Sequence, residues 1–149
     1  MELTVPNLLV IGYGNTLRGD DGVGPRVAEA VAALNLPGVQ TLTSHQLTPE
    51  LAEPISKARG VVFVDAAVDA APDIALRELT AAEPGMLMGH AVDPRLLLAL
   101  ARDVFGGQPK AWLLTVPASD LNFGDHLSET AERGVQIAVE KIRALASRR

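Results

Sequence analysis

Two adjacent carboxylates, Asp20 and Asp21, lie in the glycine-rich stretch Gly12–Gly24, between an apolar run and a helical pattern. Side-by-side carboxylates repel each other unless a cation or a proton offsets their charge. The pair therefore indicates a metal site or a proton-transfer site, and both residues are candidates for catalysis. The simpler interpretation is that they cap the helix that follows, but one acid is enough for a cap and the second is then in surplus.

A third carboxylate, Asp65, ends the apolar run Val61–Val64, which predicts a buried strand. In an open α/β sheet the carboxyl ends of parallel strands meet at one edge, where such folds place their sites. We therefore expect Asp65 to lie near Asp20 and Asp21. The alternative is that Asp65 only ends its strand or opens a turn.

His90 lies in the segment GMLMGH, just ahead of a helix predicted to start at Pro94. On its own, a histidine in a loop is more often exposed to solvent than bound to a metal. Together with Asp21 and Asp65, it would supply two carboxylates and one imidazole with open coordination positions. This donor set suits a borderline divalent ion such as nickel, zinc or iron. A metal held in this way polarises a carbonyl group or activates a water molecule.

Two further polar residues are candidates for contact with a substrate. Asn15 follows Gly14 in the first loop, where it shapes the backbone and is able to donate a side-chain hydrogen bond. His45 follows the second predicted strand, so it belongs to the same edge of the sheet. We interpret His126 as part of the start of the last helix rather than of the site.

Strand and helix patterns alternate regularly along the chain. Apolar runs separated by amphipathic helices are typical of a mainly parallel sheet covered on both sides. The pattern predicts an α/β fold, a three-layer sandwich with a mainly parallel twisted sheet. The half-exposed run 74–79 is expected to be an antiparallel edge strand. The predicted strands span 8–11, 39–43, 61–64, 74–79 and 111–116, and the predicted helices span 25–34, 49–57, 94–105 and 128–145.

Length, charge and composition narrow the class of protein. The 149 residues are expected to form one domain, 1–149, with a buried core. A net charge of −5 without a basic cluster argues against a nucleic-acid partner. The absence of cysteine excludes disulfides, thiolate metal sites and a cysteine nucleophile. With no signal-peptide pattern, no apolar run of about 20 residues and no exposed apolar stripe, we expect a cytoplasmic monomer without membrane contact.

The glycines of the first loop also resemble the start of a dinucleotide-binding fingerprint. The third glycine of that motif is missing, because its position is occupied by Leu17. In addition, Asp20 and Asp21 would repel phosphate oxygens, and the lysine of a phosphate-binding loop is absent. The sequence therefore disfavours nucleotide binding.

The run GYGNTLRGDDGVG at Gly12–Gly24 resembles the N-terminal signature of the hydrogenase maturation endopeptidases. Further matches are Val64–Ala66 at the end of an apolar strand, Gly89–His90 ahead of a helix, and Phe123–Ser128 before the final helix. The length and the order of elements agree as well, so the resemblance covers nearly the whole chain.

This resemblance implies an endopeptidase that removes the C-terminal extension of a nickel–iron hydrogenase large-subunit precursor after nickel insertion. The precursor would supply the nickel, which serves as the recognition signal, and other divalent metals are expected to substitute for it. The family's metal-contacting positions fall on Asp21, Asp65 and His90, and the first of them is Glu or Asp within the family. Asp20 is a candidate for the base that activates water. The segment Ser44–Leu51 departs from the family's pattern, which leaves the identity of the precursor open.

Two other functions stay open at this point. A non-cleaving escort would dock on the nickel-loaded precursor with the same metal-contacting residues, so only catalytic turnover distinguishes it from a protease. A phosphorylation-controlled receiver domain also pairs two acids after its first strand with a third, here Asp65, after its central strand. It would need a lysine at the end of the last strand, however, where this chain has Thr115–Pro117.

Overall fold

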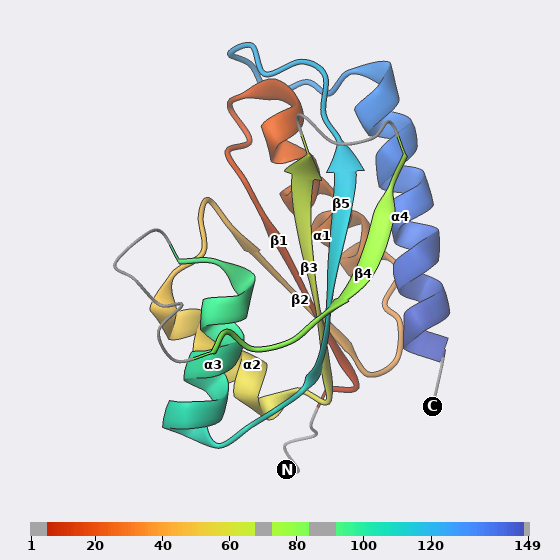
Figure 1. Ribbon diagram of the computed structural model, residues 1–149. Helices are drawn as coiled ribbons and strands as arrows, with labels where there is room; N and C mark the ends of the chain where they lie inside the picture. Colours follow the sequence, from red (N-terminus) through yellow and green to blue (C-terminus); the bar gives the residue numbers. More distant parts are fainter. Residues whose placement is uncertain (1–5, 68–72, 84–91, 148–149) are drawn as a thin grey trace.

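The computed structural model describes residues 6–67, 73–83 and 92–147, which build a five-stranded sheet with helices on both faces (Figure 1). The strands are β1 (Leu8–Tyr13), β2 (Val39–Ser44), β3 (Gly60–Ala67), β4 (Ala75–Leu79) and β5 (Lys110–Pro117). The helices are α1 (Val23–Ala33), α2 (Ala52–Lys57), α3 (Pro94–Phe105) and α4 (Glu129–Ser147). Two short 3-10 turns, η1 (Gly19–Gly22) and η2 (Pro49–Leu51), precede α1 and α2. In these described ranges, no helix is both long and apolar enough to cross a membrane.

The sheet has the strand order β2-β1-β3-β5-β4. β1, β2, β3 and β5 run parallel, and β4 pairs antiparallel with β5 at one edge. This confirms the predicted α/β class with a mainly parallel sheet and one antiparallel edge strand. The register pairs Gly12 of β1 with Val64 of β3, so Tyr13 and Asp65 emerge together at the carboxyl edge of the sheet.

Apolar side chains alternate between the two faces of the sheet, as the period of a strand requires. Val10, Val62 and Val64 pack with α1 and α4, whereas Ile11 and Phe63 point to the other face and pack with α2 and α3. Figure 1 shows these two helix pairs on opposite faces. Both faces are therefore covered, which explains why β1 and β3 are continuous apolar runs.

The start of α1 is pressed against the ends of β1 and β3. A Cβ atom on Gly24 would lie 2.5 Å from the carbonyl oxygens of both Tyr13 and Val64. On the strand side, a Cβ atom on Gly12 would lie 2.0 Å from the carbonyl oxygen of Gly24. Only glycine fits at these two positions, and the close approach holds the preceding loop directly over the sheet edge.

The predicted helices are confirmed, with small differences at their ends. α1 begins at Val23, two residues before the predicted start, so that Pro25 falls in its first turn, where a missing N–H is tolerated. The helix predicted over 25–34 also ends slightly earlier than expected. α1 ends at Ala33, and the Leu34 side chain is 39% exposed.

Candidate functional site

Asp21 lies in the loop between β1 and α1, and its carboxylate is bound back to the start of that loop. The backbone N–H of Asn15 donates to Oδ2 of Asp21 at 2.8 Å, and Asp21 is half-buried. Gly14 makes the turn possible because its φ of +145° is in the region that favours glycine. A Cβ atom there would also lie 2.0 Å from the carbonyl oxygen of Asp21. The loop therefore fixes the position of the Asp21 carboxylate.

Asp65 lies near the end of β3, and each of its carboxylate oxygens accepts one hydrogen bond. The phenol of Tyr13 donates to Oδ2 at 3.0 Å, and the backbone N–H of Ala66 donates to Oδ1 at 2.8 Å. Tyr13 is the last residue of β1, and the β1–β3 register brings it beside Asp65. These two bonds fix the plane of the Asp65 carboxylate.

Asp21 and Asp65 are close enough for their charges to interact. Burial raises the pKa of Asp65, the hydrogen bonds from Tyr13 and Ala66 oppose that change, and the negative charge of Asp21 raises the pKa further. Burial and the charge of Asp65 also raise the pKa of Tyr13, so its phenol keeps the proton that it donates. Two half-buried carboxylates that repel each other favour a bound cation or a shared proton.

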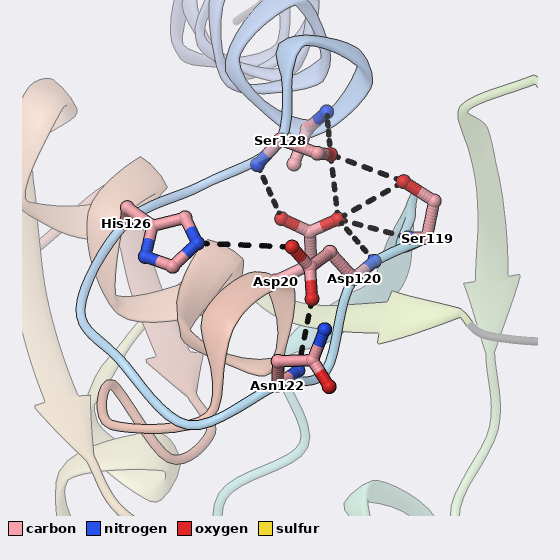
Figure 2. A network of polar contacts seen from close by, with 7 residues as sticks. Asp20, Ser119, Asp120, Asn122, His126 and Ser128 are labelled. Carbon is pink, nitrogen blue, oxygen red and sulfur yellow. Dashed lines mark hydrogen bonds and ion pairs between the residues drawn. The ribbon is translucent and has the colours of Figure 1, made fainter.

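Asp20 has a different environment, because its side chain is fully buried. Figure 2 shows its carboxylate enclosed by the segment between β5 and α4. Oδ2 accepts from the backbone N–H groups of Ser119 at 2.8 Å and Asp120 at 3.0 Å, and Oδ1 accepts from the N–H of Ser128 at 2.7 Å. The hydroxyls of Ser128 and Ser119 add bonds to Oδ2 at 2.6 and 3.4 Å. These five hydrogen bonds join two loops that are far apart in the sequence.

The geometry around Asp20 favours a structural role over the catalytic one expected from the sequence. Burial alone would raise the pKa of Asp20, but the hydrogen bonds from Ser128, Ser119 and Asp120 together hold it below its ordinary value. A buried carboxylate that accepts N–H bonds on both oxygens is poorly placed to activate a substrate water, which favours a role for Asp20 as an anchor between the two loops. The helix-cap alternative does not apply to either acid, because α1 has Gly22 as its N-cap and no side-chain cap.

His90, the third predicted metal ligand, lies outside the described residues. The described chain resumes at Val92, and Asp93 caps α3 by accepting the backbone N–H of Leu96 at 2.9 Å. After burial and the contact with Asp65, the charge of Asp93 is a further cause of the raised pKa of Tyr13. The start of α3 is therefore within electrostatic range of the Tyr13 phenol.

The predicted ligands that the structure describes are the two carboxylates, Asp21 and Asp65. Within the described part of the chain, no group of three or more histidine, aspartate or glutamate side chains is arranged to hold a metal ion. Two carboxylates fixed at one sheet edge and repelling each other suit a metal ion that arrives with ligands of its own.

The other predicted residues lie around this edge. Asn15 uses Oδ1 to accept the backbone N–H of Leu17 at 2.9 Å, which shapes the loop and leaves its NH₂ group as a donor. His45 is exposed just after β2, whose last residue Ser44 pairs with Tyr13. β1 thus separates His45 from Asp65 in the sheet order. His126 is also exposed, with Nε2 lying 3.7 Å from Oδ2 of Asp120 (Figure 2).

The residues that hold the acidic side chains in place were missed from the sequence. The position of Tyr13 does give a hint in the sequence, because Tyr13 follows Gly12 at the end of a predicted strand and therefore belongs to the same sheet edge as the acids. Ser119 and Ser128 could not be linked to Asp20 from the sequence, since they stand 99 and 108 positions from it along the chain. Contacts over such a separation become visible only when the fold is known.

No protein-family model matches this chain, and no curated protein matches it either. Several solved structures do. The hydrogenase maturating endopeptidase HybD from E. coli aligns with a TM-score of 0.73 and 23% identity, over 93% of this chain and 91% of that one. The [NiFe] hydrogenase maturation protease HycI from Thermococcus kodakarensis aligns with a TM-score of 0.73 and 22% identity, over 95% and 93% of the two chains.

A third similar structure is the hydrogenase 2 maturation peptidase from a Thaumarchaeota archaeon. It aligns with a TM-score of 0.69 and 24% identity, over 95% of this chain and 98% of that one. Identities at this level establish the fold alone. Since the alignments cover nearly the full length of both partners, this chain has the fold of the hydrogenase maturation endopeptidases.

Proposed function

We propose that this chain is an endopeptidase that removes the C-terminal extension of a nickel–iron hydrogenase large-subunit precursor after nickel has been inserted. The observation that carries the proposal is the pair of interacting carboxylates, Asp21 and Asp65, fixed at the carboxyl edge of the sheet. The run Gly12–Gly24 and the fold shared with proteins named hydrogenase maturation proteases support the same function.

In this proposal Asp21, Asp65 and His90 bind the nickel that the precursor carries. Carboxylate oxygens and an imidazole nitrogen suit a borderline divalent ion, and other divalent metals would substitute for nickel. The repulsion between the two carboxylates is relieved when a cation binds between them. We therefore treat nickel as part of the substrate, and its presence in the precursor as the condition for recognition.

The residues of the chain would act mainly by placing the precursor. A metal bound at this edge polarises a carbonyl group or orients water next to the scissile peptide. Tyr13 keeps the Asp65 carboxylate in its plane, and the NH₂ group of Asn15 is available to the substrate backbone. His45, exposed beyond β2, is a further candidate for contact with the precursor. Asp20 takes no part in this step, because its carboxylate is bound to the β5–α4 loop.

The test is the intact mass of a cognate precursor after incubation with the purified protein, with nickel-loaded and nickel-free precursor in parallel. We expect loss of one C-terminal peptide from the loaded precursor only. Asp21→Asn and His90→Ala should each strongly reduce the rate of cleavage. Asp125→Asn, an exposed change in the β5–α4 loop, serves as the matched control. Full processing by Asp21→Asn or His90→Ala would refute the site assignment.

The same experiment separates the other functions considered. Binding of the loaded precursor without cleavage would identify a non-cleaving escort. The receiver-domain alternative is not favoured, because the flavodoxin-like order that such domains share is 2-1-3-4-5. Here β5 lies next to β3, and β4 is an antiparallel edge strand.

A further inference from the structure

Two large apolar side chains are exposed on neighbouring loops above the carboxyl edge of the sheet. The Leu17 side chain in the β1–α1 loop is 54% exposed, and the Phe123 side chain in the β5–α4 loop is 83% exposed. The two loops lie side by side at the top of Figure 1. Exposed apolar residues scattered singly are ordinary on a protein surface, whereas contiguous exposed apolar patches mark interaction sites.

The backbones of the two loops are hydrogen-bonded to each other directly beside these two residues. Arg18 and Gly124 form a parallel bridge. The N–H of Gly124 donates to the carbonyl of Leu17 at 2.7 Å, and the N–H of Gly19 donates to the carbonyl of Gly124 at 2.9 Å. Leu17 and Phe123 each directly precede a residue of this bridge, and we call these two exposed apolar side chains the Leu17–Phe123 surface.

This surface is held rigidly. The backbone of Leu17 is fixed on both sides, by Oδ1 of Asn15 on its N–H and by Gly124 on its carbonyl. Below it, the buried Asp20 carboxylate ties the same two loops together (Figure 2). A backbone that is already fixed has little conformational freedom left to lose on binding, which favours association with a partner.

We propose that the Leu17–Phe123 surface docks the polypeptide of the hydrogenase large-subunit precursor beside the metal site, an inference that rests on the proposed function. Leu17 stands between Asn15 and Asp21 in one short loop, and the Asn15 N–H is bound to the Asp21 carboxylate. We therefore expect a polypeptide that brings its metal to Asp21 to contact this loop. Its apolar side chains cover Leu17 and Phe123, so that docking, rather than the metal alone, selects the precursor.

The test compares cleavage kinetics of Leu17→Ser, Phe123→Ser and the double variant on nickel-loaded precursor. Phe105→Ser and Val104→Ser are matched controls. Both remove an exposed apolar side chain, 46% and 64% exposed, from the end of α3, near where β5 begins at the opposite edge of the sheet. We expect each single change in the surface to raise KM about fivefold or more, with kcat within about twofold of wild type. The controls should leave both constants unchanged.

The outcomes separate this inference from the proposed function. If wild type cleaves and the double variant has the KM of the controls, the docking surface is refuted and the protease function stands. If wild type binds loaded precursor without cleaving it, the protease function fails, and the surface is tested by binding of the same variants in that assay. If the substitutions change self-association in sedimentation and leave KM unchanged, the surface joins copies of this chain and the inference is overturned.

Discussion

Asp20 and Asp65 are both aspartates over the same sheet edge, yet their environments are opposite. Asp20 is fully buried, accepts five hydrogen bonds and has a lowered pKa. Asp65 is half-buried, accepts two hydrogen bonds and has a raised pKa, to which the charge of Asp21 contributes. Carboxylates with satisfied oxygens stabilise a fold, whereas carboxylates that repel each other are stabilised by what they bind.

The contrast also divides two residues that are adjacent in the sequence. Asp20 and Asp21 both belong to the 3-10 turn η1, which sends one carboxylate into the β5–α4 loop and the other toward Asn15. We therefore expect a change at Asp21 to act on processing and a change at Asp20 to act on stability. If a change at Asp20 instead acted on processing and a change at Asp21 on stability, the contrast between the two residues would be refuted.

The largest effect is expected for Asp21→Asn, which removes one negative charge from the candidate metal site. Processing of nickel-loaded precursor should fall about 1,000-fold, because the metal loses a charged ligand next to the scissile bond. Thermal unfolding should be unchanged or slightly improved, since a repulsive charge is lost as well. A rate near that of wild type, measured by intact mass over time, would exclude Asp21 from the site.

Asp20→Asn should reduce the free energy of unfolding by about 3 kcal/mol, seen as a decrease in Tm of about 10 °C. Both Asp20 oxygens accept backbone N–H bonds, from Ser119 and Asp120 on one side and Ser128 on the other. In the Asp20→Asn variant, the side-chain NH₂ group would therefore face a backbone N–H donor in either orientation of the amide. Asp125→Asn, an exposed change in the β5–α4 loop, should leave Tm unaltered. If both variants lowered Tm by the same amount, the anchor role of Asp20 would be contradicted.

The anchor should also make stability depend on pH in the acid range. The pKa of Asp20 in the folded protein lies below its ordinary value of 3.8, so the folded state releases this proton more readily than the unfolded state. The contribution of Asp20 is therefore complete above about pH 4 and is lost as the pH falls through its folded-state pKa. Denaturant unfolding measured between about pH 2 and about pH 6 should show this loss of stability in wild type and much less of it in Asp20→Asn.

The sequence predicted most of this architecture because both faces of the sheet are buried. Runs such as Val61–Val64 are apolar without interruption, and the closing helix carries its buried residues on one stripe. The edge at which Asp21 and Asp65 meet follows from the same pattern, since parallel strands end together. The strand order could not be predicted, because no local property of the sequence determines which strand β5 pairs with.

The role of Asp20 was beyond sequence reasoning for a different physical reason. Whether an acidic residue is an anchor or a base depends on which donors surround it, and the donors of Asp20 come from Ser119, Asp120 and Ser128 after β5. Asp20 and Asp21 are indistinguishable in the sequence, and only their tertiary contacts give them different environments.

Tyr13→Phe sharpens the comparison on the side of the metal site. It removes the phenol that orients Asp65 and keeps the aromatic ring, which packs against the apolar cluster around Ile11 and Phe63. Loss of a group that orients a metal ligand weakens metal binding about tenfold or more. Titration calorimetry with Ni²⁺ should show this decrease while Tm stays close to that of wild type. An unchanged affinity would mean that Tyr13 does not position Asp65 for a metal.

The smallest effect is expected for Asp65→Asn in the metal-free protein, and its sign is opposite to that of Asp20→Asn. The raised pKa of Asp65 means that its ionisation opposes folding as the pH rises above 3.8. Removing the charge should therefore increase the free energy of unfolding by about 1 kcal/mol at neutral pH, while processing is lost. The gain should vanish once the pH is about one unit or more below 3.8, where Asp65 is protonated in both states. If Asp65→Asn instead destabilises the protein as Asp20→Asn does, both residues are anchors and the two regions of the edge do not differ.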